Sequence, residues 1–147
     1  MKRGMILIVG MLLLTGCEAV RSERLEGYWV NRNTESSLYD RKAVLFAPFD
    51  GVPENTEDYS GVYRIGYLCD GELVKDSVTE GWWRITYTPS QAAGCSVYAL
   101  FLAPGGKRSA EQRFELRFDG DRLILADFEK PEVTVERYSR VGTINGL

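Results

Sequence analysis

The stretch Arg113-Phe114-Glu115-Leu116-Arg117-Phe118-Asp119-Gly120 decides the fold class of this chain. Charged and apolar side chains alternate along its first six residues. Because successive side chains of a strand point to opposite faces, Phe114, Leu116 and Phe118 would face a core while the charges face water. Asp119-Gly120 then places glycine where a type I′ turn needs a positive φ, and an apolar run follows. The stretch therefore predicts one arm and the turn of an antiparallel hairpin.

The same pattern of short strands and turns continues in both directions. From Leu25 onward, runs rich in Val, Ile, Tyr, Phe and Trp are interrupted by Gly, Pro, Asn and Asp, without a sustained helical period. Asp70-Gly71 predicts a second tight hairpin. The predicted strands are Gly27 to Asn31, Lys42 to Pro48, Gly61 to Cys69, Glu72 to Val78, Trp82 to Thr88, Cys95 to Ala103, Gln112 to Asp119, Asp121 to Phe128 and Glu132 to Arg140.

Many short strands joined by short turns favour an antiparallel meander, and closing the meander into a barrel removes its exposed edges. The predicted fold is all-β: a small antiparallel up-and-down barrel of about eight or nine strands in residues 25–147. Val97 to Leu102 is apolar on both faces of its strand. Its outer face is therefore expected to be covered by a loop, a membrane or a partner.

The first residues have the pattern of an export signal. Lys2-Arg3 precedes the apolar run Met5 to Leu14, which is too short to span a bilayer, and Leu14-Thr15-Gly16-Cys17 follows. This ending resembles the bacterial lipobox, in which the cysteine receives diacylglycerol before cleavage on its amino side. An ordinary signal peptide with a chance cysteine is the alternative. We predict a lipoprotein signal peptide in residues 1–16 and a lipidated tether in residues 17–24.

The charge of the chain disfavours nucleic acid as a partner. The formal net charge is −3, and loss of Lys2 and Arg3 with the signal peptide makes the mature chain more acidic. A surface that follows a phosphate backbone needs a basic excess, which this chain lacks. Attachment to a membrane would therefore rest on the N-acyl and S-diacylglycerol chains of Cys17, and no other cofactor is expected.

Export also bears on the other two cysteines. Cys69 and Cys95 would lie in an oxidising compartment, where paired thiols tend to form a disulfide. With the predicted strands, both cysteines would lie at one end of the sheet. We therefore expect a Cys69–Cys95 bridge, with two free buried thiols as the alternative.

Leu25-Glu26-Gly27-Tyr28-Trp29 resembles the Gly-x-Trp opening of lipocalin-like proteins. Gly81-Trp82-Trp83-Arg84-Ile85, the hairpin around Asp119-Gly120 and the closing Glu136-Arg137-Tyr138-Ser139-Arg140 add to this resemblance. Together they are similar to small bacterial lipocalin-like lipoproteins. The resemblance implies that Gly27 and Trp29 begin the first strand at the closed end of a barrel. It also implies that a late arginine, Arg137 or Arg140, packs across the Trp29 ring.

Most catalytic and metal sites are disfavoured by composition. The chain contains no histidine, which removes the commonest general base and the commonest transition-metal ligand. Asp50, Glu54, Glu57 and Asp58 crowd one loop but lack the spacing of an EF-hand, so a solvated turn is the better interpretation. No metal site and no enzymatic activity are expected.

Aromatic side chains are the other candidates for a binding site. Trp82, Trp83 and Tyr98 lie on predicted strands, among aromatic residues that could line an apolar cup but more often fill a small barrel. Trp82 and Trp83 are adjacent and must face opposite sides of their strand. One of them is therefore expected outside the core, where it could contact a partner.

Three functions fit these observations. The first is a non-catalytic binding or accessory domain, anchored at the periplasmic face of the outer membrane, that acts on another envelope protein. Glu18 after the lipidated cysteine favours that membrane, since aspartate there favours retention in the inner membrane; without an outer membrane, the anchor would lie in the outer leaflet of the cytoplasmic membrane. The second is a carrier of a fatty acid or other apolar small molecule inside the barrel. The third is a periplasmic inhibitor of lysozyme or of a protease.

Overall fold

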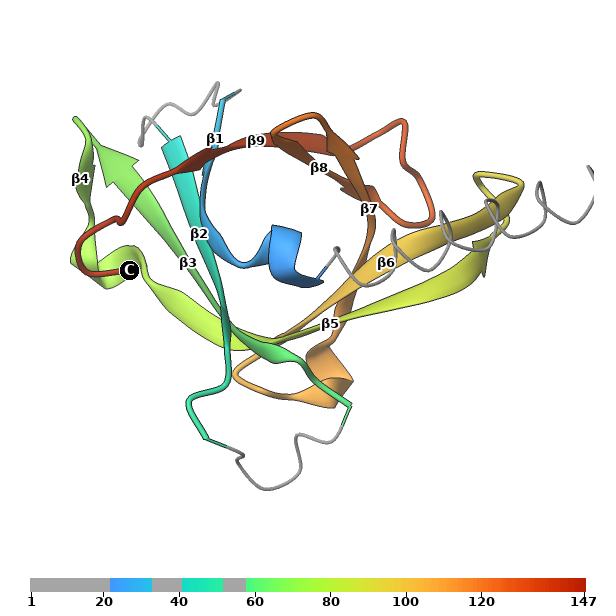
Figure 1. The fold of residues 1–147 in the computed structure, drawn as a ribbon, viewed down its shortest axis with the longest axis horizontal. Helices are drawn as coiled ribbons and strands as arrows, with labels where there is room; N and C mark the ends of the chain where they lie inside the picture. Colours follow the sequence, from blue (N-terminus) through green and yellow to red (C-terminus); the bar gives the residue numbers. More distant parts are fainter. Residues whose placement is uncertain (1–21, 33–40, 52–57) are drawn as a thin grey trace, which may run out of the picture.

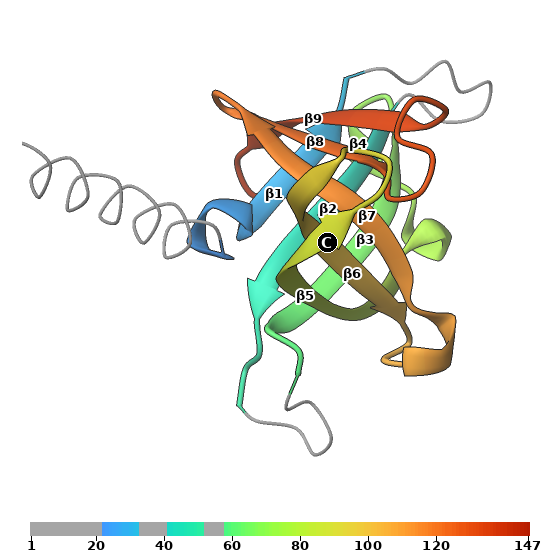
Figure 2. The same ribbon diagram turned by 90° about the vertical axis from the view of Figure 1, so that its right-hand side faces the viewer.

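The computed structural model describes residues 22–32, 41–51 and 58–147. Within these residues nine strands form one antiparallel sheet in the order β2-β1-β9-β8-β7-β6-β5-β3-β4, and a further pairing of β2 with β3 closes it. Because β4 pairs only with the end of β3, the closed ring has eight strands. Figure 1 shows this ring from one end and Figure 2 from its side. The predicted all-β barrel fold is confirmed.

The strands follow one another around the barrel as an up-and-down meander, and most of their bounds agree with the prediction. Two short 3-10 helices, η1 (Lys75–Ser77) and η2 (Arg108–Ala110), lie in the connections. The strands are β1 Gly27–Asn31, β2 Arg41–Pro48, β3 Gly61–Cys69, β4 Glu72–Leu73, β5 Thr79–Ser90, β6 Cys95–Pro104, β7 Gln112–Asp119, β8 Arg122–Asp127 and β9 Val135–Val141.

The predicted strand Glu72 to Val78 is wrong beyond Leu73. The Ser77 hydroxyl accepts the backbone N–H of Tyr67 at 3.0 Å and donates to the Val74 carbonyl at 2.5 Å. A side chain thus takes over a backbone bond that a longer β4 would have made with β3. The chain turns away through η1, and β5 pairs with β3 directly, with Thr79 opposite Ile65.

This difference also overturns the predicted Cys69–Cys95 bridge. Skipping β4 reverses the direction of each later strand relative to the prediction. Cys69 lies four residues beyond Ile65, which pairs with Thr79 at the start of β5. Cys95 pairs with Ser90, at the other end of β5. Measured along the strands, the two cysteines are therefore about 50 Å apart, far beyond the reach of a disulfide. Both are free and exposed.

The interior of the barrel is filled by large side chains. Trp29, Phe46, Trp83, Leu100 and Tyr138 are at most 1 % exposed and belong to one continuous core cluster. The register of the strands brings such side chains to the same face of the sheet. For example, Leu100 pairs with Ile85 on β5 and with Phe114 on β7, and all three side chains join the core. The barrel interior is thus a packed core.

One end of the barrel is closed by the residues before β1. Ser22 to Leu25 form a single helical turn, and Leu25 is fully buried. The Leu25 carbonyl accepts the indole N–H of Trp29 at 2.7 Å. Arg24 lies over the Phe118 ring at 4.6 Å and donates to the Gly120 carbonyl at 2.9 Å. The side-chain contacts of this cap therefore begin at Arg24, the last residue assigned to the tether.

The wall formed by β1, β2 and β3 carries a second apolar layer on its outer face. Val30, Ala43, Leu68 and Leu147 are buried there, and Leu73, Val78 and Ile144 pack against them. The chain after β9 returns across this wall, where the Arg64 guanidinium donates to the Leu147 carbonyl at 2.9 Å. Gly66 leaves room for both sides of this layer, since a Cβ there would lie 2.6 Å from Leu73 Cδ1 and 3.2 Å from Leu147 Cδ1.

Candidate functional site

Trp82 and Trp83 lie on opposite sides of β5, as predicted. Trp83 is fully buried in the barrel, donates its indole N–H to the Ala47 carbonyl at 3.1 Å and meets the Phe46 ring edge-on at 6.0 Å. Trp82 is partly exposed on the outer wall. Its ring lies 5.5 Å from Tyr59 and 5.9 Å from Phe49, measured between centroids. Trp82 is therefore the outward tryptophan.

Tyr98 does not join Trp82 in one site. It pairs with Tyr87 across the hairpin of β5 and β6, and the two rings lie 4.6 Å apart. Because Tyr87 is five positions after Trp82, the tyrosine pair lies on the opposite face of β5. Tyr98 packs against the core, whereas Tyr87 is 57 % exposed. The structure thus separates the three predicted contact residues into interior, outer wall and hairpin.

The aromatic patch around Trp82 is held by an ion pair. Arg84 donates to both carboxylate oxygens of Glu111, at 2.8 and 3.2 Å, and stacks on the Phe101 ring at 3.8 Å. The Tyr59 hydroxyl donates to the same carboxylate at 2.6 Å. Hydrogen bonding to Arg84 is the main cause that lowers the pKa of Glu111 from its ordinary value of 4.5, against the opposing effect of burial. Burial and the Glu111 carboxylate raise the pKa of Tyr59.

These contacts also cover the outer face of Val97 to Leu102. Leu100 and Leu102 point into the core, and Phe101 faces outward under the Arg84 guanidinium. The apolar pattern on both faces therefore reflects cover by the chain's own side chains. It does not require a membrane or a partner at this strand.

A second polar group lies inside the barrel. Lys42 forms an ion pair with Glu136 at 3.2 Å, and the Tyr138 hydroxyl donates to the same carboxylate. Burial, with the Glu136 carboxylate as a further cause, raises the pKa of Tyr138 far above its ordinary range, so the phenol stays protonated. Because the charges and the phenol satisfy each other, this cluster is explained as the polar part of the core.

The arginine implied by the lipocalin resemblance is Arg140. Its guanidinium carbon lies 4.3 Å from the centroid of the Trp29 ring, and it donates to the carbonyls of Glu26 and Arg24. A Cβ at Gly27, whose φ is +127°, would come within 2.5 Å of this guanidinium. The positive φ favours glycine there, and a larger residue would also displace the Arg140 guanidinium from its place over Trp29. Arg137 pairs with Ile124 on the neighbouring strand and makes no such stack with Trp29.

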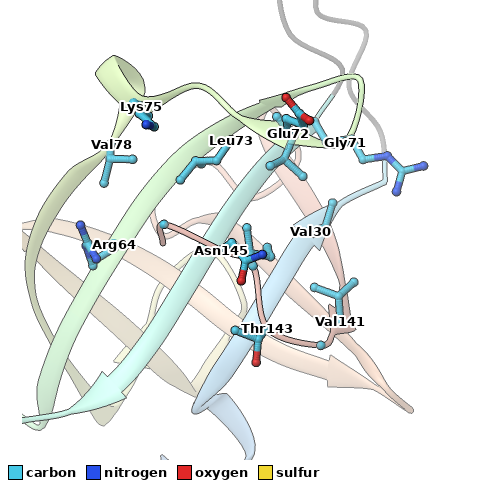
Figure 3. A pocket seen from close by; sticks show the side chains of 15 residues that line it. Val30, Arg64, Gly71, Glu72, Leu73, Lys75, Val78, Val141, Thr143 and Asn145 are labelled. Atoms are coloured by element: carbon cyan, nitrogen blue, oxygen red, sulfur yellow. The ribbon is translucent and has the colours of Figure 1, made fainter.

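An open groove lies on the outer wall between the β4–η1 segment and the chain after β9. We call it the outer groove; its volume is about 800 Å³. Figure 3 shows Arg64, Val78 and Lys75 along one side, and Val30, Val141 and Thr143 along the other. The residues that line it are Val30, Arg41, Arg64, Leu68, Gly71, Glu72, Leu73, Lys75, Val78, Val141, Gly142, Thr143, Ile144, Asn145 and Gly146.

The outer groove combines an apolar floor with charged sides. Leu68 and Val30 are buried in its floor, and the cations Arg41, Arg64 and Lys75 outnumber the single anion Glu72 among the residues that line it. The Nε atom of Arg64 is buried and has no hydrogen-bond partner. Its nearest carboxylate oxygen, on Glu80, is 3.8 Å away, too long for a hydrogen bond. The volume lies in the range of small-molecule sites.

Sequence reasoning missed this groove, although one signal was present. Ala43-Val44-Leu45-Phe46-Ala47 is apolar on both faces of its strand, as is much of Gly61 to Cys69. Like the pattern of Val97 to Leu102, this pattern indicates that both faces of the strand are covered. The apolar Ile144 and Leu147, beyond the last strand, are among the residues that cover the outer face of these strands.

The predicted anchor and most of the acidic loop fall outside the residues that the structure describes. Cys17 and residues 1–16 lie outside the described residues, as do Glu54 and Glu57 of the acidic loop. Asp58 pairs with Arg108 at 2.5 Å. Among the described residues, no three acidic or cysteine side chains gather closely enough to hold a metal ion. In the same residues no helix is long and apolar enough to cross a membrane.

Three comparisons with known proteins were negative. No protein-family model, curated protein or solved structure matches the chain significantly. The closed eight-stranded antiparallel barrel with Trp29 near its capped end is consistent with a lipocalin-like fold.

Proposed function

We propose that this chain is a lipid-anchored envelope protein whose barrel is a non-catalytic binding domain, using its outer surface to contact another envelope protein. The anchor would be lipidated Cys17, at the periplasmic face of the outer membrane, or on the outer leaflet of the cytoplasmic membrane where that is the only one. The lipobox-like Leu14-Thr15-Gly16-Cys17 supports this address. The chain would act without a cofactor other than its own lipid.

The observation that carries the binding role is the outward placement of Trp82. A partly exposed tryptophan, packed edge-on against Phe49 and braced by Tyr59, is rigid and apolar. Such residues are typical anchors of protein interfaces, because they bury much area at little cost in conformational entropy. Gly106 lies directly against the Trp82 ring, so the loop before η2 borders the proposed contact.

Site-specific photocrosslinking in intact cells tests the contact. A crosslinking amino acid at Lys107, beside the Trp82 patch, should capture one envelope protein, and Trp82→Ala should reduce its yield at an unchanged protein level. The same amino acid at Val133, which is 70 % exposed on another loop, is the matched control. Equal capture from both positions would contradict a specific contact at Trp82.

The anchor has its own test. Metabolic labelling with palmitate should mark the full chain but not its Cys17→Ser variant, and fractionation should place only the labelled protein in the outer membrane. An unlabelled chain, or a location that Cys17→Ser leaves unchanged, would refute the anchor without touching the Trp82 contact. The hypothesis of a carrier with its ligand inside the barrel is a weaker proposal, since the interior is filled by the rings of Trp29, Trp83 and Tyr138. No observation on the described residues favours the inhibitor hypothesis over the accessory role.

A further inference from the structure

We infer that the outer groove binds a single-chain amphiphile with an anionic head group, such as a long-chain fatty acid or an anionic lysophospholipid. The acyl chain would lie on the wall of β1 and β3, outside the barrel, and the head group would lie beside Arg64 and Lys75. This site is distinct from the Trp82 patch and does not depend on how the chain is anchored.

The apolar residues that line the groove indicate a ligand with an apolar chain. Its floor is the outer face of the barrel wall, where Val30 and Leu68 are buried, and its sides are the β4–η1 segment and the chain after β9. Leu73 and Ile144 pack from the two sides against this floor. A volume of about 800 Å³ holds a ligand of lipid size, and burial of the acyl chain supplies the main driving force.

Charge indicates the head group. Arg64 and Lys75 lie on the same side of the groove in Figure 3, with the apolar Val78 beside them. The Arg64 side chain is partly exposed; one of its nitrogens donates to the main-chain oxygen of Leu147 at 2.9 Å, and its Nε lies 3.8 Å from the Glu80 carboxylate. An anionic head group at the exposed part of this guanidinium would add charge-assisted hydrogen bonds. Lys75, exposed on η1, would add a second cation to the head group.

The preference for an anionic head group can be measured by comparing the affinities of ligands that differ in their head group. The chain from Glu18 to Leu147 is suitable, because the closed barrel and its end cap lie within residues 22–147. Calorimetric titration, below micelle concentrations, would compare palmitate with hexadecanol and lysophosphatidylglycerol with lysophosphatidylcholine. Each anionic ligand should bind about tenfold more tightly than its partner, with one site per chain, and the difference should shrink in high salt. The tighter of the two anionic ligands identifies the source of the head group.

Two variants locate the ligand. Thr143→Trp, at an exposed position that lines the groove, should fill it and weaken palmitate binding about tenfold or more. Lys75→Glu should weaken palmitate binding about fivefold and leave hexadecanol binding unchanged. Lys130→Glu makes the same charge change at an exposed lysine that does not line the groove, and it should change neither affinity.

Three results would overturn the inference. They are an absence of saturable binding, equal affinities for palmitate and hexadecanol, and an unchanged palmitate affinity in a folded Thr143→Trp variant. The last result would place the ligand elsewhere, most simply in the barrel interior. A urea midpoint equal to that of the parent chain shows that each variant is folded, as expected for substitutions of exposed side chains.

Discussion

The interior of the barrel and its outer wall use the same residue types for different purposes, and Trp82 and Trp83 make the comparison within one dipeptide. Trp83 is fully buried and its indole N–H is bonded to a backbone carbonyl, so the ring is part of the core. Trp82 packs against Phe49 and Tyr59 but keeps part of its surface in water. The same side chain therefore stabilises the fold on one face of β5 and is available for contact on the other.

The outer wall itself is divided. Around Trp82 its aromatic rings are braced by the Arg84–Glu111 pair, and the polar groups satisfy each other. Over β1 to β3, in contrast, an open groove separates the two flanking segments, and cations outnumber anions among the residues that line it. The difference indicates a preformed contact surface in the first region and room for a ligand in the second.

The largest expected effect is at the closed end of the barrel. Trp29→Ala should lower the free energy of unfolding by about 3 to 5 kcal/mol, because it leaves a large cavity among buried residues and removes the bond to Leu25. The urea midpoint of the chain from Glu18 to Leu147 measures it. An unchanged midpoint would mean that β1 does not complete the core and would remove the lipocalin-like interpretation.

The next prediction concerns the adjacent tryptophans. Trp83→Ala should cost about 3 to 5 kcal/mol, for the same reason as Trp29→Ala. Trp82→Ala should cost about 1 to 2 kcal/mol, since it loses two aromatic contacts but no fully buried volume. Urea unfolding of the two variants in parallel gives the difference. Equal losses of stability would contradict the division of β5 into a core face and a contact face.

A smaller effect is expected for the arginine over Trp29. Arg140→Ala should destabilise the chain by about 1 to 2 kcal/mol, because it removes the stack on the ring and two bonds to backbone carbonyls at a largely exposed site. Arg137→Ala, on the same strand, is the matched control and should stay within about 0.5 kcal/mol of the parent. Thermal and urea unfolding would both detect the contrast, and equal effects would refute the assignment of Arg140.

The smallest effect is the pH dependence of the Trp82 patch. Bonding to Arg84 lowers the pKa of Glu111 in the folded chain, so its stabilising contribution is complete above its ordinary value of 4.5. That contribution is lost as the pH falls through the lower folded pKa. Glu111→Gln should therefore cost about 1 kcal/mol at pH 7 and progressively less below about pH 4. Urea midpoints that differ by the same amount at pH 7 and pH 3 would contradict this coupling.

Local patterns predicted most of the secondary structure. The Asp-Gly turns located the ends of β3 and β7, and a run rich in β-forming residues located β1, all with their observed bounds. Adjacency alone required Trp82 and Trp83 to face opposite sides of their strand. These features depend on neighbouring residues, whose side chains and backbone conformations follow the period of the strand. For the same reason the meander and its closure followed from the number and spacing of the strands.

The rest was decided by contacts between distant parts of the chain. The bond from Tyr67 to Ser77 ended β4 early, and this one event reversed the later strands and moved Cys95 away from Cys69. The choice of Arg140 over Arg137 depended on register between β1 and β9, in which Trp29 lies opposite Arg140. The outer groove required the return of the chain after β9 across a wall made much earlier in the sequence. Pairings of this kind leave no periodic signal, because their energy comes from packing across large sequence separations.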